Sequence, residues 1–192
     1  MNSLCEDNTA WRRALRQDMA SRRAALAGAE HEALSARIVA HALATLPKPR
    51  VAAFCWPIKH EPDVRPLLAS WKNAAARVAL PVVVAENAPL RFREWTPDTR
   101  LEADLYGIPT PTTGEWLTPD LILLPLNGFD GAGYRLGYGG GYFDRTLAAL
   151  SPRPLAVGVG FEINRVASIR PAAHDQRLDW IITENGAFKP SA

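Results

Sequence analysis

Residues 133–145, GYRLGYGGGYFDR, place five glycines, two arginines and one aspartate in one short run. Glycines let a backbone turn through positive φ and approach a ligand closely, so that its N–H groups can point at an anion. Ordinary tight turns also use glycine, so the glycines alone leave both interpretations open. Arg135, Asp144 and Arg145 favour a ligand, because a phosphate site with a divalent metal needs cations beside an acid. We therefore expect this run to bind a polyphosphate.

The flanks of this run are typical of a strand and a helix. Residues 121–124, LILL, form a continuous apolar stretch like that of a strand covered on both faces, and Pro125 limits its extension. Residues 142–150 are expected to be helical, and the start of that helix would add N–H groups to an anion site. The glycine spacing matches neither the dinucleotide fingerprint nor the P-loop.

Helical and extended segments alternate along the chain. This alternation predicts an α/β fold with a mainly parallel sheet covered by helices on both faces, in which ligands bind beyond the carboxyl ends of the strands. Residues 96–119 are rich in Pro, Thr and Gly and are expected to form a long ordered loop. The expected helices are residues 10–27, ended by Gly28, then 32–46, 64–75 and 142–150; the expected strands are 51–54, 78–84, 90–95, 121–124, 155–161 and 180–183.

The composition is that of a soluble globular protein. The chain has 192 residues, of which 47% are apolar and 22% charged, so one domain over residues 1–192 is expected. A net charge of +2 is too small for a dedicated nucleic-acid binder, and no apolar run approaches the roughly 18 residues of a membrane span. Cys5 and Cys55 are too few for a disulfide framework. We expect a monomer in the reducing cytoplasm, with no nucleic-acid or membrane partner.

Arginines are concentrated near the N-terminus. Arg12 and Arg16 are four residues apart and share one helix face, and Arg23 comes close to that face two turns later. Three guanidinium groups on one face could grip phosphates. A basic face in solvent is the alternative, and it would need no ligand. A nucleic-acid module could also use these arginines, although no nucleic-acid motif accompanies them.

Acidic residues follow the first expected strand in the segment WPIKHEPD. A carboxylate of Glu61 or Asp63 could accept hydrogen bonds from an amino-pyrimidine ring, and Trp56 could pack against a flat heterocycle. A surface turn with a buried tryptophan is the alternative interpretation.

Two further aspartates could supply hard oxygen ligands for magnesium, which is usually held by one or two carboxylates together with phosphate oxygens. Asp144 could instead be a helix-terminal charge or a partner of Arg145, and Asp175 could make a loop hydrogen bond beside His174. The aromatic residues of the glycine run could lie in the core or stack on a flat ring: Tyr134, Tyr138, Tyr142 and Phe143.

Residues 120–148, DLILLPLNGFDGAGYRLGYGGGYFDRTLA, closely resemble the signature of the 5-formyltetrahydrofolate cyclo-ligase family. The arginine-rich N-terminal helix, Glu61 with Asp63, and residues 174–186, HDQRLDWIITENG, extend the resemblance over almost the whole chain in order. It implies an ATP- and magnesium-dependent enzyme that converts 5-formyltetrahydrofolate to 5,10-methenyltetrahydrofolate, ADP and phosphate. It also implies a three-layer α/β/α sandwich of the sugar-phosphate isomerase and CoA-transferase type.

The resemblance also implies a role for each matching residue. Arg135 and Tyr142 would be catalytic, and Asp144 and Asp175 would bind magnesium. The implied folate-binding residues are Trp56, Pro57 and Glu61. The implied ATP-binding residues are Arg12, Arg16, Arg135, Leu136, Gly137, Tyr138, Gly139, Gly140, Gly141, Tyr142 and Phe143.

The chain departs from the family pattern at a few positions. Arg12 stands where many members have lysine, and the two cations differ in reach and hydrogen-bond geometry. Phe143 replaces a commoner tyrosine and so lacks its hydroxyl, and the segment WPIKHEP differs from the commoner shorter form. These departures leave a second hypothesis open: a catalytically silent paralogue that binds folate or nucleotide.

Overall fold

The computed structural model describes residues 2–191, with side chains from residue 8 onward, and its centre is an 8-stranded sheet. The strands of this sheet are β1 (Val51–Phe54), β2 (Arg77–Val82), β3 (Arg91–Glu94), β6 (Trp116–Leu117), β7 (Leu121–Pro125), β10 (Leu155–Val159), β11 (Trp180–Thr183) and β12 (Gly186–Phe188). Their order is β12-β11-β10-β7-β1-β2-β3-β6. The central neighbours from β11 to β2 are parallel, whereas β12, β3 and β6 join the edges antiparallel. The expected mainly parallel α/β sheet is confirmed.

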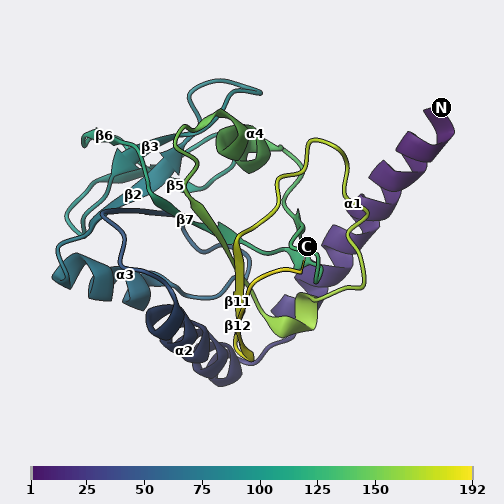
Figure 1. The fold of residues 1–192 in the computed structure, drawn as a ribbon, viewed down its shortest axis with the longest axis horizontal. Helices are drawn as coiled ribbons and strands as arrows, with labels where there is room; N and C mark the ends of the chain where they lie inside the picture. The colour runs from purple at the N-terminus through teal and green to yellow at the C-terminus, as the bar shows by residue number, and fades with distance from the viewer. Residues whose placement is uncertain (1, 192) are drawn as a thin grey trace.

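Helices cover both faces of the sheet, as Figure 1 shows. Helices α2 (Gly28–Thr45) and α3 (Arg65–Asn73) lie on one face, and α4 (Tyr142–Ala149) lies on the other. The expected three-layer α/β/α arrangement is therefore confirmed.

The LILL stretch of β7 packs against the helices on both faces of the sheet. Leu121 and Leu123 pack in the core beneath α2 and α3, and Ile122 and Leu124 pack in the core beneath α4. All four side chains are buried, because successive residues of a strand point to opposite faces of the sheet and here both faces are covered. The absence of polar alternation in this stretch is therefore what a central parallel strand requires.

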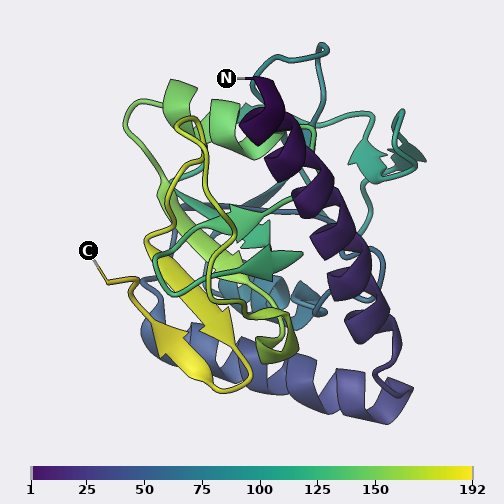
Figure 2. The ribbon, with the colours of Figure 1, turned by 90° about the vertical axis from the view of Figure 1, so that its right-hand side faces the viewer.

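Helix α1 (Asn2–Ala24) crosses the edge of the sheet where the parallel strands end, as Figure 2 shows. Its Met19 is fully buried and packs closely beside Gly128. A Cβ on Gly128 would lie 3.4 Å from the Met19 Cγ. Arg22 of the same helix donates a hydrogen bond to the carbonyl of Ile163 in the short helix η1 (Glu162–Asn164). The helix therefore covers the loops that follow β7 and β10.

Several sequence-based boundaries were wrong. The first helix runs over Asn2–Ala24 rather than residues 10–27, and Gly28 begins α2 instead of ending α1, because residues 25–27 alone make the turn. The region 96–119 is not only a loop: it contains β6 and the hairpin of β4 (Leu101–Ala103) with β5 (Pro109–Pro111).

The glycine run also holds an unpredicted strand. Its first part is β9 (Arg135–Leu136), which pairs antiparallel with β8 (Gly128–Phe129), so a hairpin separates β7 from the glycines. Strands of two or three residues depend on their partners rather than on local preference, which explains why the sequence did not indicate them.

A close approach at Gly160 predicts a measurable loss of stability. A Cβ on Gly160, just after β10, would lie 2.6 Å from the Leu126 Cβ and 3.2 Å from the Leu126 carbonyl oxygen. We expect Gly160→Ala to lower the free energy of unfolding by about 1–3 kcal/mol, because the neighbouring main chain must move. Gly28→Ala is the control: it meets open space in a helix, so stability stays unchanged or rises by up to about 1 kcal/mol. Equal urea midpoints for the two variants would contradict this packing.

Candidate active site

The glycine loop brings helix α1 and helix α4 together. Gly139 and Gly141 have φ of 104° and 63°, and Gly141 is the N-terminal cap residue of α4. Residues with a Cβ are strained at such angles, so this turn needs glycine at both positions. The loop therefore ends at the N-terminus of a helix, which favours binding of an anion.

Arg16 of α1 lies against this loop. Its Nε donates a 2.7 Å hydrogen bond to the Gly137 carbonyl, and its guanidinium carbon is 3.5 Å from the place where a Cβ on Gly139 would lie. Burial, together with the nearby charge of Arg12, lowers the pKa of Arg16. The interpretation of a solvated basic face is therefore wrong for Arg16, which contacts the glycine loop.

Two largely buried ion pairs join the predicted cationic residues to the predicted metal ligands. Arg12 Nη2 lies 2.6 Å from Asp175 Oδ2, and Arg135 Nη1 lies 3.1 Å from Asp144 Oδ1. The backbone N–H of Gln176 also donates to Asp144 Oδ1, at 3.0 Å. Because Gln176 follows Asp175, this hydrogen bond brings both aspartates to the same corner of the site. Two residues 31 positions apart in sequence thus lie together, as the sequence predicted.

The two aspartates fit a magnesium ion that is shared with a polyphosphate. Within the described residues, no cluster of three or more His, Cys, Asp or Glu side chains is arranged to hold a metal. Asp144 and Asp175 each use one oxygen, Oδ1 and Oδ2 respectively, for their arginine. Magnesium commonly takes one or two carboxylates and completes its shell with phosphate oxygens and water, so this donor set is sufficient.

Glu61 is the buried carboxylate of a second part of the site. Only 5% of the residue is exposed, its Oε1 accepts a 2.5 Å hydrogen bond from the Tyr138 hydroxyl, and its Oε2 accepts one from the Ile58 N–H. Burial raises the pKa of Glu61, and burial together with the Glu61 charge raises the pKa of Tyr138. Since Tyr138 belongs to the glycine loop, this bond connects the loop directly to the segment after β1.

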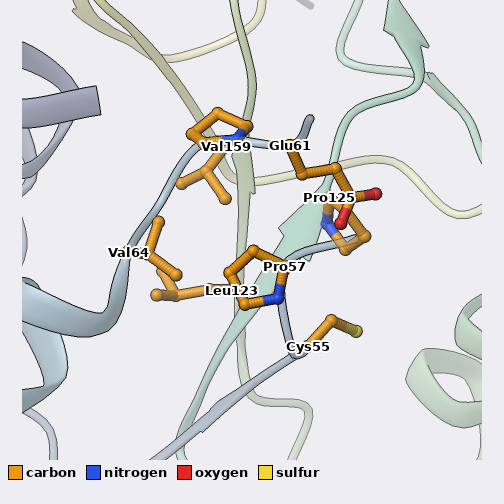
Figure 3. Close-up of a pocket in the computed structure, with 8 residues that line it drawn as sticks. Cys55, Pro57, Glu61, Val64, Leu123, Pro125 and Val159 are labelled. Atoms are coloured by element: carbon orange, nitrogen blue, oxygen red, sulfur yellow. The ribbon is translucent and has the colours of Figure 1, made fainter. Parts of the chain in front are cut away.

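A small pocket lies beside Glu61 at the carboxyl ends of β1, β7 and β10 (Figure 3). In this view Glu61 and Val159 lie on one side and Cys55 on the other. Burial raises the pKa of the Cys55 thiol, so it stays protonated and is a poor nucleophile. Apart from Cys55 and Glu61, the lining is apolar. The lining residues are Cys55, Pro57, Glu61, Pro62, Val64, Leu123, Pro125 and Val159.

Some predicted contact residues lie elsewhere. Trp56 does not line this pocket; its ring packs 5.9 Å from the Trp95 ring, and the Arg65 guanidinium lies 5.7 Å from its centre. Asp63 is also outside the pocket and forms an ion pair with Arg65 at the surface. Of the predicted folate-binding residues, Pro57 and Glu61 line the pocket and Trp56 does not.

Tyr142 and Phe143 lie at the start of α4, and both pack against the core on its face of the sheet. The Tyr142 hydroxyl is 3.0 Å from the hydroxyl of Tyr106, which belongs to the β4–β5 hairpin, while the Arg135 guanidinium lies 5.9 Å from the Phe143 ring. Arg145 donates to the Gly140 carbonyl and Asp144 pairs with Arg135, so the alternative in which Asp144 pairs with Arg145 is wrong. Tyr106 was missed by the sequence analysis, although an aromatic residue in a Pro- and Gly-rich connection is a signal for a ligand-contacting loop.

Comparison with known proteins identifies this arrangement. The sequence profile of the 5-formyltetrahydrofolate cyclo-ligase family matches residues 8–184. The chain belongs to this family. Its relatives named 5-formyltetrahydrofolate cyclo-ligase include one from Mycolicibacterium smegmatis, 30% identical over 66% of this chain and 70% of the relative, and one from Haemophilus influenzae, 27% identical over 87% and 94%.

Solved structures of this cyclo-ligase family share the fold. The 5,10-methenyltetrahydrofolate synthetase of Aquifex aeolicus superposes with a TM-score of 0.79 at 29% identity, covering 94% of this chain and 93% of that one. A synthetase from Mycoplasma pneumoniae gives a TM-score of 0.75 at 26% identity, covering 90% and 98%. The family resemblance and the expectation of an enzyme are therefore confirmed. No helix among the described residues is long and apolar enough to cross a membrane.

Glu61 and Asp63 predict opposite effects of pH on stability. The pKa of Glu61 is raised above its ordinary 4.5, mainly by burial, so its stabilising contribution is present below that value and is lost as pH rises through the raised pKa. The Arg65 hydrogen bond lowers the pKa of Asp63 below 3.8, so that contribution is present above this value and is lost as pH falls through the lowered pKa.

We therefore expect Glu61→Gln to become more stable relative to the unaltered protein as pH rises from about 3 to about 8. Asp63→Asn should become less stable relative to it over the same interval. Denaturant unfolding at several pH values measures both differences. Slopes of the same sign for the two variants would contradict the assigned burial of Glu61.

Proposed function

We propose that this single-domain protein converts 5-formyltetrahydrofolate to 5,10-methenyltetrahydrofolate, using ATP and magnesium and releasing ADP and phosphate. The observation that carries the proposal is the Tyr138–Glu61 hydrogen bond, which joins an anion-binding loop to a pocket with a buried carboxylate. Family membership supports the reaction class, and this junction supports the proposal that the nucleotide and the folate ring bind next to each other.

The chemistry explains why the site contains arginines and glycines rather than a protein nucleophile. A formamide oxygen is a poor leaving group, so it must be activated. In the proposed reaction this oxygen attacks the γ-phosphorus of ATP, an O–P bond forms, and ADP leaves. N10 then attacks the formyl carbon and gives up its proton, which leaves with the phosphate as the five-membered ring closes. Such transfer depends on in-line positioning and on neutralising charge.

The triphosphate is proposed to bind between α1 and the glycine loop. Arg16 already contacts the loop, and Arg12 and Arg135 each offer a guanidinium that is held in place by an aspartate. Bidentate donors of this kind suit phosphate oxygens. Arg135 and Tyr142 are proposed to be the catalytic residues, at the end of the nucleotide. The proposed ATP-binding set is Arg12, Arg16, Arg135, Leu136, Gly137, Tyr138, Gly139, Gly140, Gly141, Tyr142 and Phe143.

Asp144 and Asp175 are proposed to hold the magnesium ion, which supplies charge neutralisation to the phosphates when bound. Glu61 and Pro57 are proposed to bind the pterin ring, with the carboxylate accepting hydrogen bonds from its amino edge. Trp56 remains a prediction as a folate contact. We also propose that the protein is a cytoplasmic monomer.

The direct test is to mix the purified protein with 5-formyltetrahydrofolate, ATP and magnesium. Absorbance follows the methenyl product while ADP is measured in parallel. We expect one ADP for each product molecule. Ligand binding without either product would establish the silent-paralogue hypothesis instead, and absence of binding by both ligands would overturn the proposal.

The ion pair between Arg135 and Asp144 predicts two opposite effects of Asp144→Asn. Loss of a carboxylate should weaken magnesium binding on the order of 100-fold and reduce turnover accordingly. The same change removes the counter-charge of Arg135, so metal-free ATP should bind about tenfold more tightly, which corresponds to about 1.4 kcal/mol. Calorimetry in the presence of a chelator measures the second effect without turnover. The control is Asp98→Asn at an exposed position, where neither binding nor turnover should change.

A further inference from the structure

Arg23 is a fully buried cation near the end of α1, with a relative exposure of 0%. The sequence placed it with Arg12 and Arg16 as a possible phosphate contact, but its guanidinium is turned into the protein. Its Nη1 donates to the carbonyl and the side-chain oxygen of Asn127, at 3.2 and 2.7 Å, and its Nε donates to the Lys59 carbonyl at 3.4 Å. Its Nη2 is buried and has no hydrogen-bond partner among the described residues.

A buried guanidinium without a bonded carboxylate is unusual, since burying a charge is costly unless an opposite charge compensates it. Glu61 is also buried, and the charge of Arg23 lowers its pKa against the larger rise that burial causes. The carboxylate of Glu61 accepts its hydrogen bonds from the Tyr138 hydroxyl and the Ile58 N–H. Arg23 therefore influences it through its electrostatic field and through its hydrogen bond to the main chain of the same segment.

The hydrogen bonds of Arg23 join three segments of the chain. Lys59 lies two residues before Glu61, and Asn127 lies just after β7. The Asn127 carbonyl also accepts a 3.0 Å hydrogen bond from Asn164 in η1. One side chain of α1 therefore holds the segment that carries Glu61 against the end of the central strand.

We propose that Arg23 is a positioning residue for the folate: it fixes the segment that carries Glu61, so that the carboxylate faces the amino edge of the ring. This inference rests on the proposed function. Direct contact with the ligand is not part of it, because Arg23 has no exposed surface. Arg16 and Arg23 are seven residues apart, about 10 Å along the helix. In this proposal the middle of α1 binds the nucleotide, and its C-terminal end positions the folate.

The charge of Glu61 is set by groups on each element around it, so the test must separate them. Arg23 faces it from α1, and Lys59 and Cys55 belong to its own segment. Tyr138 faces it from the glycine loop, and His31 of α2 bonds to its main-chain carbonyl. A carbon-NMR titration of the labelled Glu61 carboxyl reports on this group alone.

The experiment compares Arg23→Met and Arg23→Lys with Arg22→Met, which removes the neighbouring exposed arginine. For Arg23→Met we expect the KM for 5-formyltetrahydrofolate to rise tenfold or more, while the KM for ATP stays within about twofold. The acid limb of folate binding and the NMR pKa of Glu61 should both move to higher pH. Arg23→Lys keeps the charge but not the fork of donors. It should restore the pH behaviour and leave the KM for folate raised. Arg22→Met should change neither.

An equal rise in both KM values, or an unchanged Glu61 titration, would overturn the proposal and leave Arg23 a merely structural residue. If Arg23→Met does not fold, Arg23→Lys decides between the same outcomes, since a raised KM for folate alone supports positioning and an unaltered one contradicts it. If the unaltered protein neither binds nor converts the folate, the proposed function fails, and this failure is recognisable because the Glu61 titration still reports the Arg23 effect.

Discussion

The insertion of arginine side chains from one helix into the carboxyl edge of the sheet is the interaction on which the site depends. Arg16 bonds to the glycine loop, Arg12 to the loop that carries Asp175, and Arg23 to the segment after β1 and the end of β7. Each of these loops leaves a different strand and has little regular structure of its own. Their mutual placement therefore comes from α1, which acts as a common anchor.

Charge balance explains how such a site can be stable before a ligand arrives. A cluster of guanidinium groups suited to phosphates would repel itself if left alone, and burial would add a desolvation cost. Arg12 and Arg135 are each paired with an aspartate, so the positive charges are compensated within the folded protein. The same ion pairs keep the aspartates in place, so the arginines and the aspartates fix each other's positions.

Much of the fold could be predicted from local pattern. The LILL stretch indicated a strand with two covered faces, and β1 and β11 were predicted with their correct bounds, because buried parallel strands are short apolar runs. The glycines, Arg135 and Asp144 indicated the loop. Pairing between distant residues could not be predicted, since no local signal shows that Arg23 turns inward or that Trp56 packs beside Trp95.

The contact between Arg12 and Asp175 joins residues that are 163 positions apart. A ribosome delivers the chain from its N-terminus, so the first helix emerges long before the loop that must neutralise it. Until that loop has left the tunnel, Arg12 lacks its counter-charge. Assembly of the site is thus among the last events of synthesis, because a chain that stops before this loop lacks Asp175.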